Sequence, residues 1–89
     1  MTEWVITNDF VGGDAWTQGP SGGGMTRDGI LGHPDAVEFM LLDGDGRVCY
    51  SGYLAGEDYF APLCDFGMPN AGCESVMYRE KGKLIWEHL

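Results

Sequence analysis

The sequence predicts a mainly β protein: one small domain, residues 1–89, built on an antiparallel sheet of four or five strands with two hairpins and at most one short helix. The strongest observation is a pair of apolar runs that flank an Asp/Gly turn within residues 37–54, which is a strong hairpin signal. A second pair of runs lies within residues 75–89. The length, 89 residues, suits a single domain with a modest core. An α+β fold is the alternative.

The first hairpin is the segment around which we expect the sheet to form. An apolar run from residue 37 to 42, interrupted only by Glu38, leads into the turn Asp43-Gly44-Asp45-Gly46. Beyond the turn, alternation places one set of side chains on a common face: Val48, Tyr50, Gly52 and Leu54. A helix over residues 34–42 is the competing prediction, because Pro34 suits a first helical turn. The segment is short for a helix, and the Asp-Gly turn favours a strand.

The segments before this hairpin are a short strand at residues 4–7 and a long Gly-rich loop at residues 12–35. The loop holds eight glycines and two prolines and shows no sustained period of 2 or 3.6. Long loops in compact domains are uncommon and are usually functional or disordered. We expect a partly anchored flap, pinned to the core by its apolar side chains, which are Trp16, Met25, Ile30 and Leu31.

After the first hairpin, the sequence predicts one helical turn, a connector and the second hairpin. Pro62 argues against an interior strand, so residues 59–66 are expected to lay a short helix over the sheet. Residues 67–72 are rich in Gly, Pro and Asn and are expected to form a turn-rich connector. Strands at 75–79 and 83–89 then pair across residues 80–82.

The charge of the chain is strongly negative and unevenly distributed. Fourteen acidic residues face five basic ones, for a net charge of −9. Residues 1–78 hold twelve acids and only Arg27 and Arg47, a net of −10, whereas residues 79–89 carry a net of +1. Such a body repels phosphate backbones, so direct nucleic-acid binding is not expected. A basic protein partner is compatible with it, and eleven aromatic residues leave an apolar face for self-association into a homo-oligomer.

The cellular location that we expect is the cytoplasm. The first residues carry acids and show no basic segment followed by an apolar one, as a secretory signal would. The longest uninterrupted apolar run, residues 39–42, is far too short to span a membrane, so no membrane contact is expected. Three cysteines without framework spacing fit reduced thiols.

No catalytic constellation, metal site or cofactor site is predicted. Residues 43–46 fit an EF-hand loop poorly, because aligning Gly46 with the invariant glycine places Leu41 and Gly52 where ligands belong. The cysteines and histidines lack the close pairs of zinc sites. Acidic neighbours beside Cys64 and Cys73 disfavour a thiolate nucleophile. The glycines at 22–24 are not followed by the lysine of a phosphate-binding loop.

The candidate binding residues are acids at predicted turns and aromatics beside them. Acids displayed on the loops of a rigid sheet present a negative surface to a basic partner, or imitate a phosphate backbone. Aromatic side chains near the Gly-rich loop provide stacking surfaces for a ligand. The residues selected on these grounds are Asp43, Asp45, Glu57, Asp58, Asp65, Trp16 and Tyr59.

Several short stretches of the C-terminal half resemble a group of known sequences. They include residues 41–46, residues 60–63, residues 65–73 and the closing Trp86-Glu87-His88-Leu89. Together they are similar to small uncharacterised proteins of bacterial mobile elements, including phage and integron gene cassettes. The resemblance implies a genetic setting and no particular activity.

The leading functional prediction is therefore a non-enzymatic acidic binding protein of mobile-element origin. Two alternatives stay open. The first is a small-ligand-binding protein, or minor enzyme, that uses the Gly-rich loop as a flap. The second is an acidic nucleic-acid mimic that inhibits a defence or nucleic-acid enzyme.

Overall fold

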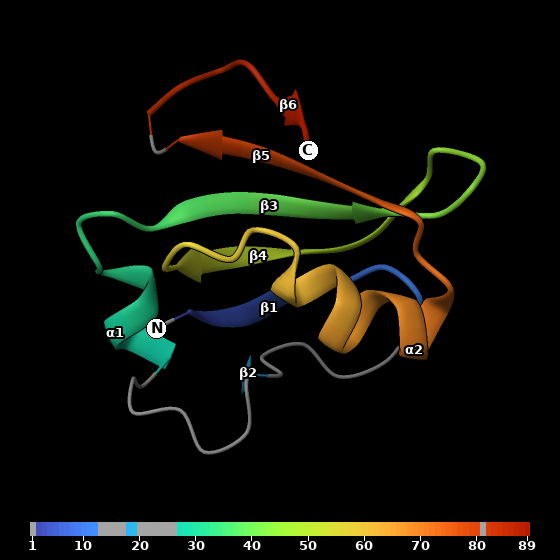
Figure 1. The fold of residues 1–89 in the computed structure, drawn as a ribbon, viewed down its shortest axis with the longest axis horizontal. Helices are drawn as coiled ribbons and strands as arrows, with labels where there is room; N and C mark the ends of the chain where they lie inside the picture. The colour runs from blue at the N-terminus through green and yellow to red at the C-terminus, as the bar shows by residue number, and fades with distance from the viewer. Residues whose placement is uncertain (1, 13–17, 20–26, 81) are drawn as a thin grey trace.

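The computed structural model describes residues 2–12, 18–19, 27–80 and 82–89 and confirms a mainly β fold (Figure 1). One antiparallel sheet holds six strands in the order β2-β1-β4-β3-β5-β6. Two of them are only two residues long. The strands are β1 (Glu3–Asp9), β2 (Gln18–Gly19), β3 (Val37–Leu42), β4 (Val48–Ala55), β5 (Ser75–Glu80) and β6 (Glu87–His88). The helical segments are α1 (Arg27–Leu31), the π-helix η1 (Leu63–Gly67) and α2 (Met68–Ala71).

The first predicted hairpin is confirmed as β3–β4, here called the central hairpin. Its turn closes with the Asp43 N–H donating to the Arg47 carbonyl at 3.0 Å and the Gly46 N–H to the Asp43 carbonyl at 3.0 Å. Gly46 has a φ of 81°, a conformation that glycine adopts without strain. A register shift opposite Leu41 and Leu42 marks a bulge at Cys49. Residues 37–42 are a strand and not a helix because both β4 and β5 pair with them.

One face of the sheet carries the main core. The buried side chains include Trp4, Phe39, Leu41 and Tyr50, and the helical layer over them contributes Leu63. Phe66, from η1, packs against both Trp4 and Tyr50, with ring centroids 5.6 Å and 4.8 Å apart respectively. The predicted helical cover over the sheet is therefore present, and Figure 1 shows η1 and α2 lying across the strands.

The opposite face of the sheet is covered in part by α1. Ile30 packs against Val5 and Ala55, which point away from the main core. Next to this contact, a cross-strand row runs Val5, Tyr53, Glu38 and Arg79 through β1, β4, β3 and β5. These positions alternate with the core row, so they belong to the second face.

Two segments before β5 differ from the local predictions. The connector expected at residues 67–72 contains the helix α2, because Pro69 stands in its first turn and Gly72, with a φ of 63°, ends it in the left-handed conformation. The Gly-rich loop expected at residues 12–35 contains β2 and α1. Half of the predicted flap, residues 13–17 and 20–26 with Trp16 among them, lies outside the described residues. Within the described part of the chain, no helix is long and apolar enough to cross a membrane.

The second predicted hairpin, β5–β6, is present but is paired over a short length only. We call it the C-terminal hairpin. Its ladder joins Met77 to His88 and Tyr78 to Glu87. Residues 83–86, expected as part of a strand, are not in strand conformation. Figure 1 shows this segment arching away from β5 before β6 returns to it.

Candidate functional site

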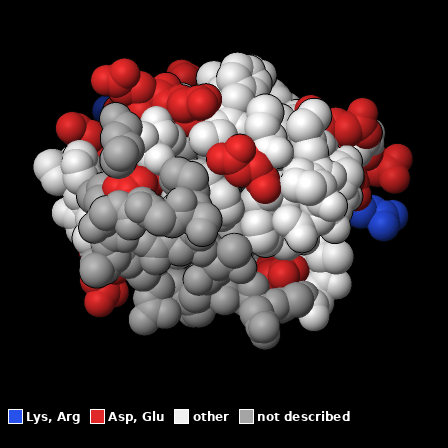
Figure 2. Space-filling view, turned by 60° about the horizontal axis from the view of Figure 1, so that its bottom comes forward, with Lys and Arg blue, Asp and Glu red and all other residues white. Residues whose placement is uncertain are grey.

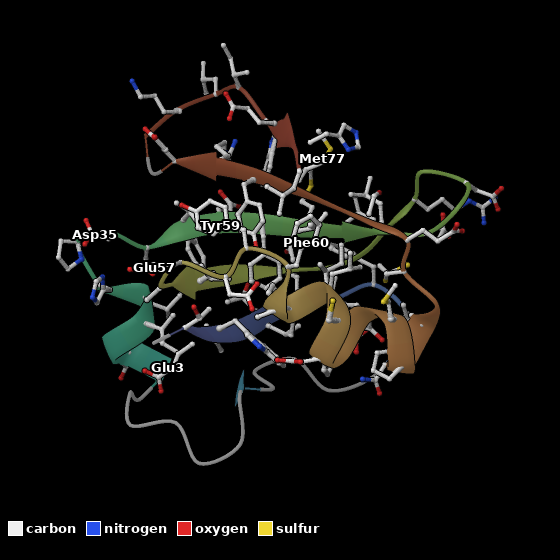
Figure 3. All side chains as sticks on the ribbon, viewed as in Figure 1. Glu3, Asp35, Glu57, Tyr59, Phe60 and Met77 are labelled. Carbon is white, nitrogen blue, oxygen red and sulfur yellow. The ribbon has the colours of Figure 1, made fainter. Side chains whose placement is uncertain are left out.

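A hollow lies between the C-terminal hairpin and the sheet, and we call it the C-terminal groove. Its volume is about 560 Å³. β5 and the returning segment line it, together with the end of β3 and Tyr59 from the segment before η1. The lining residues are Val37, Tyr59, Tyr78, Arg79, Glu80, Gly82, Lys83, Leu84, Ile85 and Glu87. Figure 3 shows Tyr59 over the strands on the side of β5.

The floor of the groove is aromatic. The rings of Tyr59 and Tyr78 are stacked, with centroids 4.4 Å apart and planes 28° apart. The Tyr78 hydroxyl also donates a hydrogen bond to the backbone carbonyl of Tyr59. Burial raises the pKa of Tyr78, and the nearby Tyr59 and Asp58 add to the shift. The floor is therefore an aromatic pair held by a ring stack and a hydrogen bond.

The rim of the groove carries two exposed aliphatic side chains beside charged ones. Leu84 and Ile85 present 88% and 76% of their surface to solvent, the two largest exposures among the described large apolar side chains. The turn before them is held by the Lys83 N–H donating to the Glu80 carbonyl at 3.0 Å. Gly82 in this turn has a φ of 80°. The rim thus places two aliphatic side chains in water directly beside an aromatic floor.

Arg79 anchors the C-terminal hairpin on the second face of the sheet. Its Nε donates to Glu38 Oε1 at 3.1 Å, and its guanidinium lies 4.5 Å from the centre of the Trp86 ring. A second hollow of about 360 Å³ lies on this side and is lined by Glu38, Tyr53, Arg79, Gly82, Lys83 and Leu84. The charge of Arg79 is thus already engaged within the chain, whereas Lys83 stands at the rim.

The predicted acids of the β3–β4 turn have a role in that turn. Asp43 Oδ1 accepts hydrogen bonds from the N–H groups of Asp45, at 2.9 Å, and Arg47, at 3.0 Å. This is the usual way in which an aspartate closes a turn on its own backbone. Asp45 is exposed beside it.

The other predicted acids lie elsewhere. Glu57 and Asp58 follow the far end of β4, which at eight residues separates them from the β3–β4 turn by about 25 Å. Asp58 Oδ1 accepts the Phe60 N–H at 3.1 Å. Asp65 is exposed on η1. Figure 2 shows acidic side chains in several separate groups on the face that it presents. The structure does not gather the predicted acids into one surface, and their binding role stays a prediction.

Among the predicted binding residues that the structure describes, Tyr59 alone lines the groove, and sequence reasoning missed the residues that surround it. Leu84 and Ile85 were assigned to a strand, in which alternation would bury one of the two. The available signal was that these two apolar residues are adjacent in the last predicted strand. That strand ends the sheet, and a strand at a sheet edge has no further strand to cover it.

The thiols of the chain are free, and two of them are buried. Burial raises the pKa of Cys73 to about 12, and the neighbouring Cys49 thiol adds to the shift. Cys73 is therefore protonated at neutral pH and is a poor nucleophile. Cys64 is exposed on η1. Across the described ranges, no three His, Cys, Asp or Glu side chains come together in a way that could hold a metal ion.

Comparison with protein-family models, with curated proteins and with solved structures finds no match to this chain.

Proposed function

We propose that this chain is a non-enzymatic interaction protein that binds another protein chain through the C-terminal groove. The observation that carries the proposal is the exposure of Leu84 and Ile85, at 88% and 76%, beside the groove. Burying one aliphatic side chain of this size contributes about 1.5–3 kcal/mol. Association that buries Leu84 and Ile85 would gain this free energy. The isolated chain does not gain it, because both side chains are exposed to water.

The composition of the groove supports a protein partner. Protein interfaces combine an apolar centre, rich in aromatic residues, with a polar rim. Here the stacked Tyr59 and Tyr78 form the centre, and Lys83, Glu80 and Glu87 surround it. The Tyr78 side chain is also fixed by the hydrogen bond that it donates to the Tyr59 backbone carbonyl, and the Tyr59 ring stacks on it, so binding costs little side-chain entropy at the centre.

The setting that we propose is the cytoplasm of a bacterium that carries a mobile element. The sequence resemblance supports the mobile-element origin. The three free thiols, two of them buried, support a reducing compartment.

Site-specific photo-crosslinking tests the proposed function. A photoreactive amino acid replaces Ile85 at the rim, and the matched control replaces Met68, an apolar residue of α2 that is 52% exposed. In expressing cells we expect protein adducts from position 85 that are not seen from position 68. Leu84→Glu should remove those adducts, because a buried carboxylate opposes the contact. Absence of any position-specific adduct, to this chain or to another protein, would contradict the proposal.

A small-molecule ligand is the second candidate, and the groove itself favours it. Its volume of about 560 Å³ and its aromatic lining fall within the range of ligand sites. Binding of a ligand to the folded state alone raises the melting temperature. A thermal-shift screen of nucleotides, metabolites and aromatic acids tests this candidate, with Leu84→Ser as the control that should weaken any stabilisation. A screen without a stabilising compound would count against it.

A further inference from the structure

We infer that the partner in the C-terminal groove is a second copy of this chain, joined about a two-fold axis. This inference rests on the proposed function and names its partner. In a two-fold contact the same patch faces itself, so residue i of one copy meets residue j of the other and the reverse. The patch must therefore be complementary to itself in both shape and charge.

The charge distribution makes this patch the favourable meeting point for two copies. Residues 1–78 carry a net charge of −10, so most other faces bring like charges together. Residues 79–89 hold Arg79, Lys81 and Lys83 against Glu80 and Glu87, for a net of +1. Two chains of net charge −9 repel each other least where each presents this segment.

The charged groups at the rim are also arranged for self-pairing. Arg79 is held by Glu38 and Trp86, so Lys83 is the described basic side chain that the rim offers to a partner. Glu80 and Glu87 line the same groove and are exposed. A two-fold axis places Lys83 of each copy opposite the carboxylates of the other.

The apolar groups fit the same arrangement. Leu84 and Ile85 stand at the rim, and the stacked Tyr59 and Tyr78 form the floor. A two-fold contact brings the aliphatic rim of each copy over the aromatic floor of the other. Both copies then bury Leu84 and Ile85, and neither needs to rearrange its sheet.

The salt dependence of association distinguishes a second copy of this chain from a basic protein partner. The acidic bodies of two copies repel, and salt screens that repulsion, with a Debye length of about 8 Å at 0.15 M. We therefore expect the dimer to tighten between low salt and about 0.15 M. A basic partner held by the acids of this chain would instead be released as salt rises.

Paired charge reversals test the inference by sedimentation equilibrium or by size-exclusion chromatography with light scattering. Lys83→Glu makes the rim wholly acidic, and Glu80→Lys with Glu87→Lys makes it basic. Each variant alone should raise the dimer dissociation constant at least about tenfold, because like charges then face each other across the axis. An equimolar mixture of the two variants should restore a dimer that contains one chain of each kind.

The controls change the net charge equally at other places. Arg47→Glu matches Lys83→Glu, and Asp45→Lys with Glu57→Lys matches the basic rim. These residues are exposed and lie outside the groove, so their variants should keep the dimer. A dimer that responds to the controls as strongly as to the rim variants would overturn the inference.

Failure of the inference can be told apart from failure of the proposed function. A monomer at every concentration and salt, with position-85 adducts to a different protein, would overturn the second copy and leave an interaction protein. A monomer whose groove binds a small molecule would overturn the second copy in favour of the ligand. A monomer without adducts or ligand would contradict both.

Discussion

The central hairpin and the C-terminal hairpin have similar turns but differ in how far their strands pair. Each turn contains a glycine in the left-handed region, Gly46 with a φ of 81° and Gly82 with a φ of 80°. The central hairpin pairs from Val37 to Leu42 with β4 and is flanked by β1 and β5. In its described residues the C-terminal hairpin has two paired positions, and its second strand lies at the edge of the sheet.

The difference lies in what covers the two hairpins. Phe39 and Leu41, in the centre of the sheet, are completely buried, whereas Leu84 and Ile85 are largely exposed. A turn can start a hairpin, but burial fixes the register, because a shift by one residue would move every core side chain to the opposite face. No such penalty applies to Leu84 and Ile85, which lie between the contacts that Lys83 and Trp86 make with β5. The C-terminal hairpin therefore keeps an unpaired segment that is free to make other contacts.

The largest expected effect comes from truncating one apolar side chain in each region. Phe39→Ala should lower the free energy of unfolding by about 3–5 kcal/mol, because it leaves a cavity beside Tyr78 in a packed core. Leu84→Ala, which truncates an exposed side chain, should change it by less than about 0.5 kcal/mol. Urea unfolding at concentrations low enough to keep the chain monomeric measures both. Similar losses in the two variants would break the comparison.

A smaller effect is expected at alkaline pH from the buried thiol beside the central hairpin. Burial and Cys49 raise the pKa of Cys73 to about 12 from an ordinary value of 9.0. The folded chain therefore keeps a proton that the unfolded chain releases above pH 9, so stability is complete below about pH 9 and falls as pH rises toward 12. The slope approaches about 1.4 kcal/mol per pH unit for one proton.

The measurement is urea unfolding under reducing conditions at several pH values between 8 and 10. The unfolded tyrosines, whose ordinary pKa is 10.0, begin to titrate near the top of this range in every variant, so the difference between variants isolates the thiol. Cys73→Ala should flatten the decline. Cys64→Ala, which removes the exposed thiol, should leave it unchanged. A decline of equal steepness in wild type and Cys73→Ala would show that the thiol is not the group responsible.

The sequence predicts an element well where its local signals agree with each other, and poorly where the outcome depends on packing. The central hairpin could be predicted because the Asp-Gly turn and the apolar run before it agree with each other. The helix α2 was missed because Pro69 and Gly72 are turn signals in isolation. In the structure they stand at the two ends of one short helix. A sequence of this length does not distinguish a turn from a short helix with Pro at its start and Gly at its end.

The candidate site was harder to predict than the fold. Tyr59 was selected, but Leu84 and Ile85 became part of the site only because β6 pairs at Glu87 and His88 and leaves them uncovered. That outcome depends on strand order, which no local pattern contains. Asp43 was selected for its charge, and its carboxylate instead closes the β3–β4 turn.

The smallest expected effect is also the sharpest test of the comparison. Gly46→Ala and Gly82→Ala impose similar backbone strain, and in neither case does a described residue beyond the two chain neighbours come within 4 Å of the new methyl group. Packing therefore does not contribute to the difference. Gly46→Ala should lower the free energy of unfolding by about 1 kcal/mol, because the central hairpin cannot open without losing the core.

Gly82→Ala should cost less than about 0.5 kcal/mol globally, because the short ladder of the C-terminal hairpin can open locally and relieve the strain. Local opening should instead speed amide hydrogen exchange at Leu89, whose N–H donates to the Val76 carbonyl at 3.1 Å. Urea unfolding and exchange monitored by NMR measure the two effects. Equal global losses would mean that the C-terminal hairpin unfolds only with the core, and its rim would then be a fixed surface and not a separately mobile one.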